Sequence, residues 1–162
     1  MTKEQKQIYT LRISEANKTE LVVILYDMLL DYVKEAEDAM DLQNSDTDNR
    51  NEIKEAVRKA RGCLKELMNS LDLQYEISGN LLSLYVYANR QLVMAEIRKD
   101  KDSLSNVTTV IKPLRDAYAK VAEEDDSEAI MMNTQKVVAG LTYSKNEINE
   151  AMDDQANRGF YV

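Results

Sequence analysis

The chain has 162 residues, which is the size of one domain that can bury a sizeable core. Its net charge of −8 at pH 7 disfavours nucleic acid and anionic membranes as partners, because both require a basic face. With one proline, four glycines and 44% hydrophobic residues it has few places to turn, and this composition favours an all-α fold.

Several catalytic and metal-dependent classes are excluded by residue types that the sequence lacks. The chain has no histidine, so it offers no phosphoacceptor imidazole, no Glu-x-x-His di-iron ligands and no imidazole ligands for zinc. Its glycines are scattered singly, which excludes a glycine-rich phosphate loop. Cys63 lies in an amphipathic segment, where a small buried thiol is a simpler interpretation than a nucleophile. We therefore expect no metal, no cofactor and no enzymatic activity.

The remaining signals indicate a cytoplasmic protein. A lone cysteine fits a reducing compartment, and the first residues show no apolar signal region. No apolar run approaches the roughly 18 residues of a membrane span. The chain is expected to be soluble.

Capping residues and polar loops divide the sequence into helices. Asn17 and Glu20 have the spacing of a capping box, and they predict the start of the first long helix. A polar loop over 44–51 ends it, and the segment around Ser78-Gly79-Asn80 is expected to open the third helix. The predicted helices run from Asn17 to about Gln43, from the loop to near Asp72, from about Ser78 to about Lys99, and from Leu104 to Val121.

Four helices joined by short loops predict an antiparallel up-down bundle over residues 17–122. Residues 1–16 would form a movable N-terminal segment, and residues 123–162 a partly helical C-terminal extension that docks on the bundle. Pro113 lies inside the fourth helix, where it would bend the helix around the core or open a groove. The apolar anchors of the extension are Leu141, Tyr143, Ile148, Phe160, Tyr161 and Val162.

Two of the predicted helices are apolar on two faces. A bundle helix needs only one such face, so the second must be covered by the tail or by a partner. In the third helix the core face contains Leu81, Leu84, Tyr85, Ala88, Leu92 and Ala95, and the second contains Leu82, Val86, Val93 and Ile97. In the first helix the core face contains Leu21, Leu25, Met28, Leu29, Tyr32 and Ala36, and the second contains Val23, Tyr26, Leu30 and Val33.

The run Glu20-Leu-Val-Val-Ile-Leu-Tyr26-Asp27 resembles the start of the first long helix in the flagellar secretion chaperones of the FliS family. Further blocks over 67–71, 80–95 and 114–118 resemble the same family in the same order, so that the resemblance covers roughly residues 8–121. The sequence departs from the family pattern in its Ala16-Asn17-Lys18-Thr19 cap, and its tail extends past the usual end.

This resemblance implies a cytosolic chaperone. Members of the FliS family hold the disordered C-terminal segment of flagellin in apolar grooves, which blocks premature polymerisation and presents the subunit for type III export. Components of the export gate are further implied partners. The expected client-binding residues are Ile8, Tyr9 and Ile13 in the N-terminal segment, and Val23, Tyr26, Leu30, Val86, Val93, Met94 and Ile97 on the second faces.

Two alternatives remain open from the residues alone. The second apolar faces equally fit a self-association seam, in which case the protein is a homo-oligomeric structural bundle or adaptor, or forms a weak homodimer. The other alternative is an enzyme whose active site consists only of Tyr, Glu and Lys side chains, but no arrangement of these residues in the sequence indicates one.

Overall fold

A computed structural model describes residues 1–42 and 49–131, and all regular structure in these ranges is helical. This confirms the predicted all-α class. The helices are α1 (Lys3–Glu15), α2 (Lys18–Asp41), α3 (Arg50–Asn69), α4 (Glu76–Arg98) and α5 (Lys101–Glu124).

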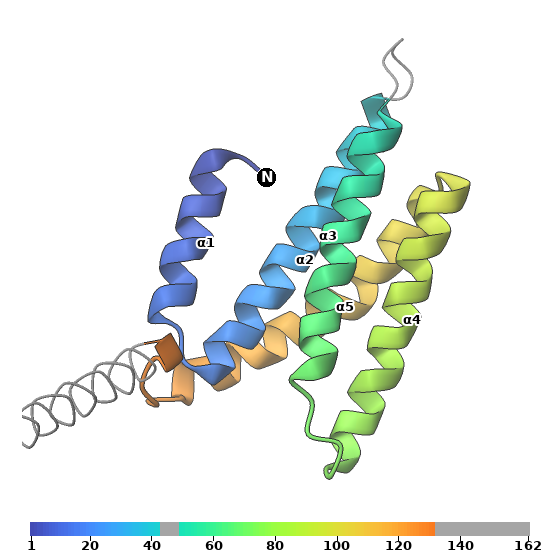
Figure 1. Cartoon of the computed structure of the whole chain (residues 1–162). Coiled ribbons are helices and arrows are strands. Elements are labelled where there is room, and N and C mark those ends of the chain that lie inside the picture. Colours follow the sequence, from blue (N-terminus) through green and yellow to red (C-terminus); the bar gives the residue numbers. More distant parts are fainter. Residues whose placement is uncertain (43–48, 132–162) are drawn as a thin grey trace, which may run out of the picture.

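Helices α2 to α5 form the predicted bundle (Figure 1). Helix α2 packs against both α3 and α5, while α4 packs against α3 and α5. Helix α5 crosses obliquely behind the other helices and ends beside the start of α2, and α1 lies along the side of α2 away from α3. The centre of the core holds fully buried side chains from all four bundle helices, among them Leu29, Val57, Leu64, Leu92 and Ile111.

The first long helix begins as predicted. Asn17 Oδ1 accepts from the Glu20 amide and Glu20 Oε2 accepts from the Asn17 amide, both at 2.9 Å. The N-terminal segment predicted over residues 1–16 contains the helix α1. It has a capping box of its own between Thr2 and Gln5, with the same spacing as the one that starts α2.

The boundaries of the last two helices differ from the prediction. Helix α4 begins at Glu76, so Ser78 and Gly79 lie inside its first turn instead of opening it. Helix α5 begins at Lys101 and not at Leu104, because Asp100 caps it by accepting from the Asp102 amide at 2.9 Å. The helix continues through Pro113 to Glu124.

The second apolar face predicted for the first long helix is part of the core. Tyr26 and Val33 are 0% and 1% exposed, whereas Leu21 and Leu25 of the predicted core face are only partly buried. The reason is that α2 is packed against α1, α3 and α5, so it buries a wider arc than one bundle face. Two residues predicted for core faces of other helices, Leu84 and Val121, are exposed.

The chain that follows α5 is attached to the junction of α1 and α2. Asn17 Nδ2 donates to the carbonyl oxygens of Asp125 at 3.0 Å and Ser127 at 3.4 Å, and the Ile130 amide donates to the carbonyl of Ala16 at 3.1 Å. The apolar anchors predicted for the tail, from Leu141 to Val162, lie outside the described residues. Among the helices that are described, none is long and apolar enough to cross a membrane.

Candidate functional site

The outer face of α4 is apolar and exposed. Val86 is 45% exposed and Ile97 is 71% exposed, and Val93 and Met94 are partly buried beside them. The opposite face of the same helix carries Leu92, which is fully buried. The second apolar face predicted for this helix therefore exists as an exposed surface, unlike the one predicted for α2.

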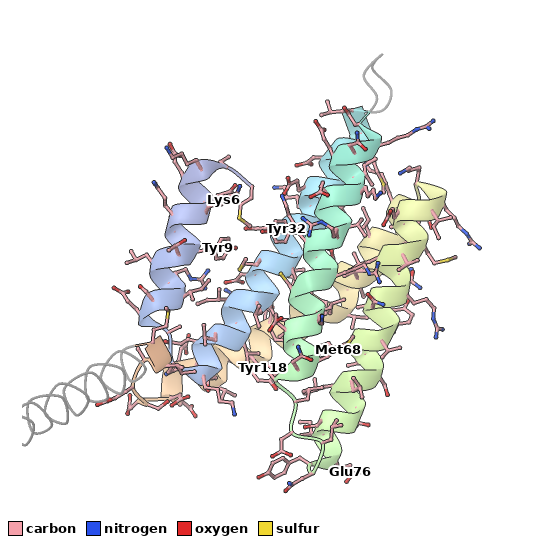
Figure 2. All side chains as sticks on the ribbon, viewed as in Figure 1. Lys6, Tyr9, Tyr32, Met68, Glu76 and Tyr118 are labelled. Atoms are coloured by element: carbon pink, nitrogen blue, oxygen red, sulfur yellow. The ribbon has the colours of Figure 1, made fainter. Side chains whose placement is uncertain are left out.

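A groove of about 380 Å³ runs between α3 and α4 next to this face. Arg61 Nε donates to Asn89 Oδ1 at 2.9 Å across it, which fixes Asn89 on the side of α4 that faces α3. Val86 and Val93 lie one turn on either side of Asn89 along α4, on the outer surface of the helix next to the groove. Figure 2 shows Met68 at the lower part of α3, and it lines the groove together with Arg58, Arg61, Gly62, Leu64, Lys65 and Asn89.

Helix α1 is held to α2 by polar contacts and by a small apolar cluster. Tyr9 points from α1 toward α2 (Figure 2), and its hydroxyl donates to Asp31 Oδ2 at 2.6 Å. Burial is the largest cause that raises the pKa of Tyr9, and this hydrogen bond is the second. The phenol therefore stays protonated and donates to the carboxylate. Ile13 is partly buried against the core of the junction, whereas Ile8 is 59% exposed.

Asp27 is the common partner of two arginines from different helices. Its Oδ2 lies 2.8 Å from Arg12 Nη2 of α1, and its Oδ1 lies 2.7 Å from Arg115 Nε of α5. The carboxylate is largely buried, which strengthens both pairs relative to exposed ion pairs. Asp27 thus joins three helices at one point. A cleft of about 510 Å³ opens beside it, lined by Arg12, Glu15, Ala16, Glu20, Val23, Ile24, Ala119, Ala122 and Glu123.

Three tyrosines meet in the interior between α2, α4 and α5. The hydroxyls of Tyr26 and Tyr85 are hydrogen-bonded to each other, and the ring centroids of Tyr26 and Tyr118 lie 5.7 Å apart. Burial is the largest cause that raises the pKa of Tyr26 and of Tyr85, so both phenols remain neutral. This cluster is part of the core and leaves Tyr26 without exposed surface.

The predicted client-binding residues therefore lie on two surfaces and in the core. The α1 residues and the α4 residues belong to helices on opposite sides of the bundle (Figure 1). The prediction that Tyr26 lies outside the core is wrong, and Val23 is only 7% exposed, because α1 and α5 cover this part of α2. Ile8, Val86 and Ile97 are exposed, Tyr9 is buried, and Ile13, Leu30, Val93 and Met94 are partly buried.

The described residues contain no arrangement of side chains that indicates catalysis. Cys63 is buried, and that burial raises the pKa of its thiol to about 11, which leaves almost no thiolate at neutral pH. The described ranges contain no group of three or more acidic, cysteine or histidine side chains placed to hold a metal ion. What the molecule offers instead are apolar and charged surfaces.

Comparison with known proteins decides the family. Residues 1–125, which include all five helices, match the family described as "FliS: Flagellar protein FliS". The chain belongs to the FliS family. It is also similar to the "Flagellar secretion chaperone FliS" of Bacillus subtilis (strain 168), with 28% identity over 113 residues that cover 70% of this chain and 81% of that protein.

Several residues that carry the family resemblance contact one another in the fold. Tyr26 is hydrogen-bonded to Tyr85, and the adjacent Asp27 pairs with Arg115, so the blocks on α2, α4 and α5 are joined at neighbouring points. These residues hold the bundle together. The basic residues of α3 beside the groove, Arg58, Arg61 and Lys65, were not predicted as site residues, because sequence spacing within α3 does not show that α4 lies next to them.

Proposed function

We propose that this chain is a cytoplasmic export chaperone that acts by binding and not by catalysis. It holds the disordered C-terminal segment of flagellin on its apolar surface, prevents premature polymerisation and delivers the subunit to the flagellar type III export apparatus. Family membership and the printed name of the Bacillus subtilis relative support a flagellar secretion chaperone. The choice of flagellin as client comes from the family resemblance.

The observation that carries the proposal is the exposed apolar face of α4. Val86 and Ile97 present large apolar side chains to solvent next to a groove, which is the surface that an amphipathic client helix needs. A disordered client becomes ordered when its apolar stripe is covered there, and the same contact hides the stripe from other subunits. Ile8 and Ile13 on α1 would supply a second, separate contact.

A charge on this face tests the client site. Val86→Asp is expected to weaken binding of a flagellin C-terminal fragment by at least about tenfold, measured by titration calorimetry. In the unbound protein the new carboxylate remains hydrated because Val86 is exposed, whereas in a filled groove it is desolvated without a partner. The helicity and thermal midpoint of the variant should match those of the parent protein.

Two matched variants of the same helix serve as controls. Asn80→Asp adds the same charge at an exposed polar position of α4 that is turned away from Val86, and it should leave binding unchanged. Leu92→Asp places it in the core, where Leu92 is 0% exposed, and should unfold the bundle. If Val86→Asp binds the fragment as tightly as the parent, the α4 face is not the client site. If it instead abolishes a concentration-dependent dimer seen by sedimentation, the face is a homodimer seam.

A further inference from the structure

Helix α3 is basic, although the chain as a whole is acidic. Its 20 residues include six basic and three acidic side chains, whereas the net charge of the chain is −8. Four of the basic residues are exposed and follow one another at i, i+4, i+7 and i+11, so they lie in one row along the helix. We call them the basic row: Lys54, Arg58, Arg61 and Lys65.

The basic row runs along the side of α3 that borders α4. Arg61 Nε donates to Asn89 Oδ1 of α4 at 2.9 Å, and Arg58 and Lys65 line the groove between the two helices together with Arg61. Helices α3 and α4 run antiparallel (Figure 1). The Arg61–Asn89 hydrogen bond therefore sets which residues of the two helices lie at the same level along the groove.

Large apolar side chains of α4 lie at the same levels as the basic side chains of α3. Counted from the Arg61–Asn89 bond in opposite directions, three levels match to within one residue, or about 1.5 Å along a helix axis. Each level combines one apolar with one basic residue: Val86 with Lys65, Val93 with Arg58, and Ile97 with Lys54. The exposed apolar face of α4 and the basic row thus form two parallel rows.

Acidic neighbours neutralise only part of the basic row. Arg58 pairs with Glu55 at 2.9 Å, and both side chains are well exposed, so this pair is weak. Among the residues that the structure describes, the other three members of the row form no ion pair, and neither does Glu96 of α4. At physiological ionic strength the Debye length is about 8 Å, so a ligand at the groove meets this local positive charge more than the distant acidic side chains.

The ligand that suits both rows is an amphipathic helix with carboxylates along one edge of its apolar stripe. Its apolar side chains would cover Val86, Val93 and Ile97, while its carboxylates would accept hydrogen bonds from the basic row. We propose that the α3–α4 surface selects client helices of this acid-edged kind. The inference rests on the proposed function, and it adds the chemistry by which the client is chosen.

Other ligands fit the two rows less well. A helix without acidic residues would remove water from the basic row and offer its charges no partner. A nucleic acid would find positive charge on α3, but the row beside it consists of Val86, Val93 and Ile97, which provide no aromatic ring for a base to stack on. The net charge of −8 also repels a long polyanion.

Charge reversal in the full chain tests the proposal. Lys54→Glu combined with Lys65→Glu should weaken binding of the flagellin C-terminal fragment by at least about tenfold in titration calorimetry. Both lysines are exposed, so the thermal midpoint should stay close to that of the parent. The matched control is Lys112→Glu combined with Lys120→Glu, at exposed positions of α5 outside the groove lining. It changes the net charge equally and should leave the affinity within about twofold, because distant surface charges are screened.

Two synthetic helical peptides test the acidic edge directly. They share one apolar stripe, which is flanked by Glu in the first peptide and by Lys in the second. On the parent protein the Glu-edged peptide should displace the flagellin fragment and the Lys-edged peptide should not. In the Lys54→Glu, Lys65→Glu variant this preference should be lost, because the row no longer has a net positive charge.

The outcomes separate this inference from the proposed function. If the double reversal on α3 binds the fragment as tightly as the parent while Val86→Asp weakens binding, selection by an acidic edge is overturned and the client site on α4 stands. If neither variant changes binding, both proposals are wrong. Equal displacement by the two peptides overturns the inference, and so does a short single-stranded RNA that displaces the fragment as well as the Glu-edged peptide does.

Discussion

Two buried hydroxyls fix how α2 and α4 face each other. Tyr26 and Tyr85 are 0% and 1% exposed, and each provides the other's hydrogen-bond partner in the core. A buried hydroxyl that loses its partner keeps the cost of its desolvation, whereas removal of both hydroxyls leaves an apolar contact. The pair therefore specifies the register of two helices more than it adds net stability.

We expect Tyr85→Phe to lower the free energy of unfolding by about 1–3 kcal/mol, because it leaves the Tyr26 hydroxyl buried without its partner. Tyr26→Phe should behave similarly. The double variant Tyr26→Phe, Tyr85→Phe should lose clearly less than the sum of the two single losses. Urea unfolding of all four proteins measures this cycle. Additive losses would show that the two hydroxyls are not coupled.

At the scale of the helix, the turn from α4 into α5 is made by a residue in an unfavourable conformation. Lys99 ends α4 with φ 54° and ψ 42°, which is the left-handed region that favours glycine. It is the one described non-glycine residue with positive φ. The chain reverses there within two residues, since Asp100 already caps α5.

Lys99→Gly is therefore expected to raise the free energy of unfolding by about 1 kcal/mol, since a left-handed conformation costs roughly 1–2 kcal/mol for a residue with a Cβ. Lys99→Ala is the matched control. It removes the same amine and methylene groups but keeps the Cβ, so it should give no such gain. Equal stabilisation by both variants in urea unfolding would assign the effect to the lysine side chain and not to the backbone.

The helix start that sequence analysis predicted best is the one marked by a capping box. The Asn17–Glu20 box gave the start of α2 to the residue. The Thr2–Gln5 box of α1 has the same form, but the large residues of that segment, such as Ile8, Tyr9 and Leu11, point to several sides, so no stripe marked a helix. The faces of α2 were assigned wrongly because sequence periodicity does not reveal that three helices surround it.

The candidate surface was also predictable only in part. The second face of α4 could be recognised from Val86, Val93 and Ile97, since the described residues leave that side of the helix uncovered. The groove beside it depends on two helices being neighbours. Sequence spacing within one helix contains no information on that, so the position of Arg61 opposite Asn89 could not be predicted.

At the scale of the whole molecule, the C-terminal extension is tied to the bundle where the family match ends. The match stops at residue 125, and Asp125 and Ile130 are hydrogen-bonded to the α1–α2 junction. The extension therefore starts from a fixed point on the bundle. We expect the rest of the extension to fold back on the bundle and to cover apolar surface that the client would use, so that the extension and the client compete.

Truncation after Met131 tests this competition while it keeps the contacts of Asp125 and Ile130. Without the tethered segment, a flagellin C-terminal fragment no longer has to displace an intramolecular competitor, so calorimetry should show tighter binding than in the full chain. Exposure of the α4 face should also increase self-association, measured by sedimentation. Weaker binding by the truncated protein, with unchanged helicity and monomer mass, would mean that the extension contributes to the client site.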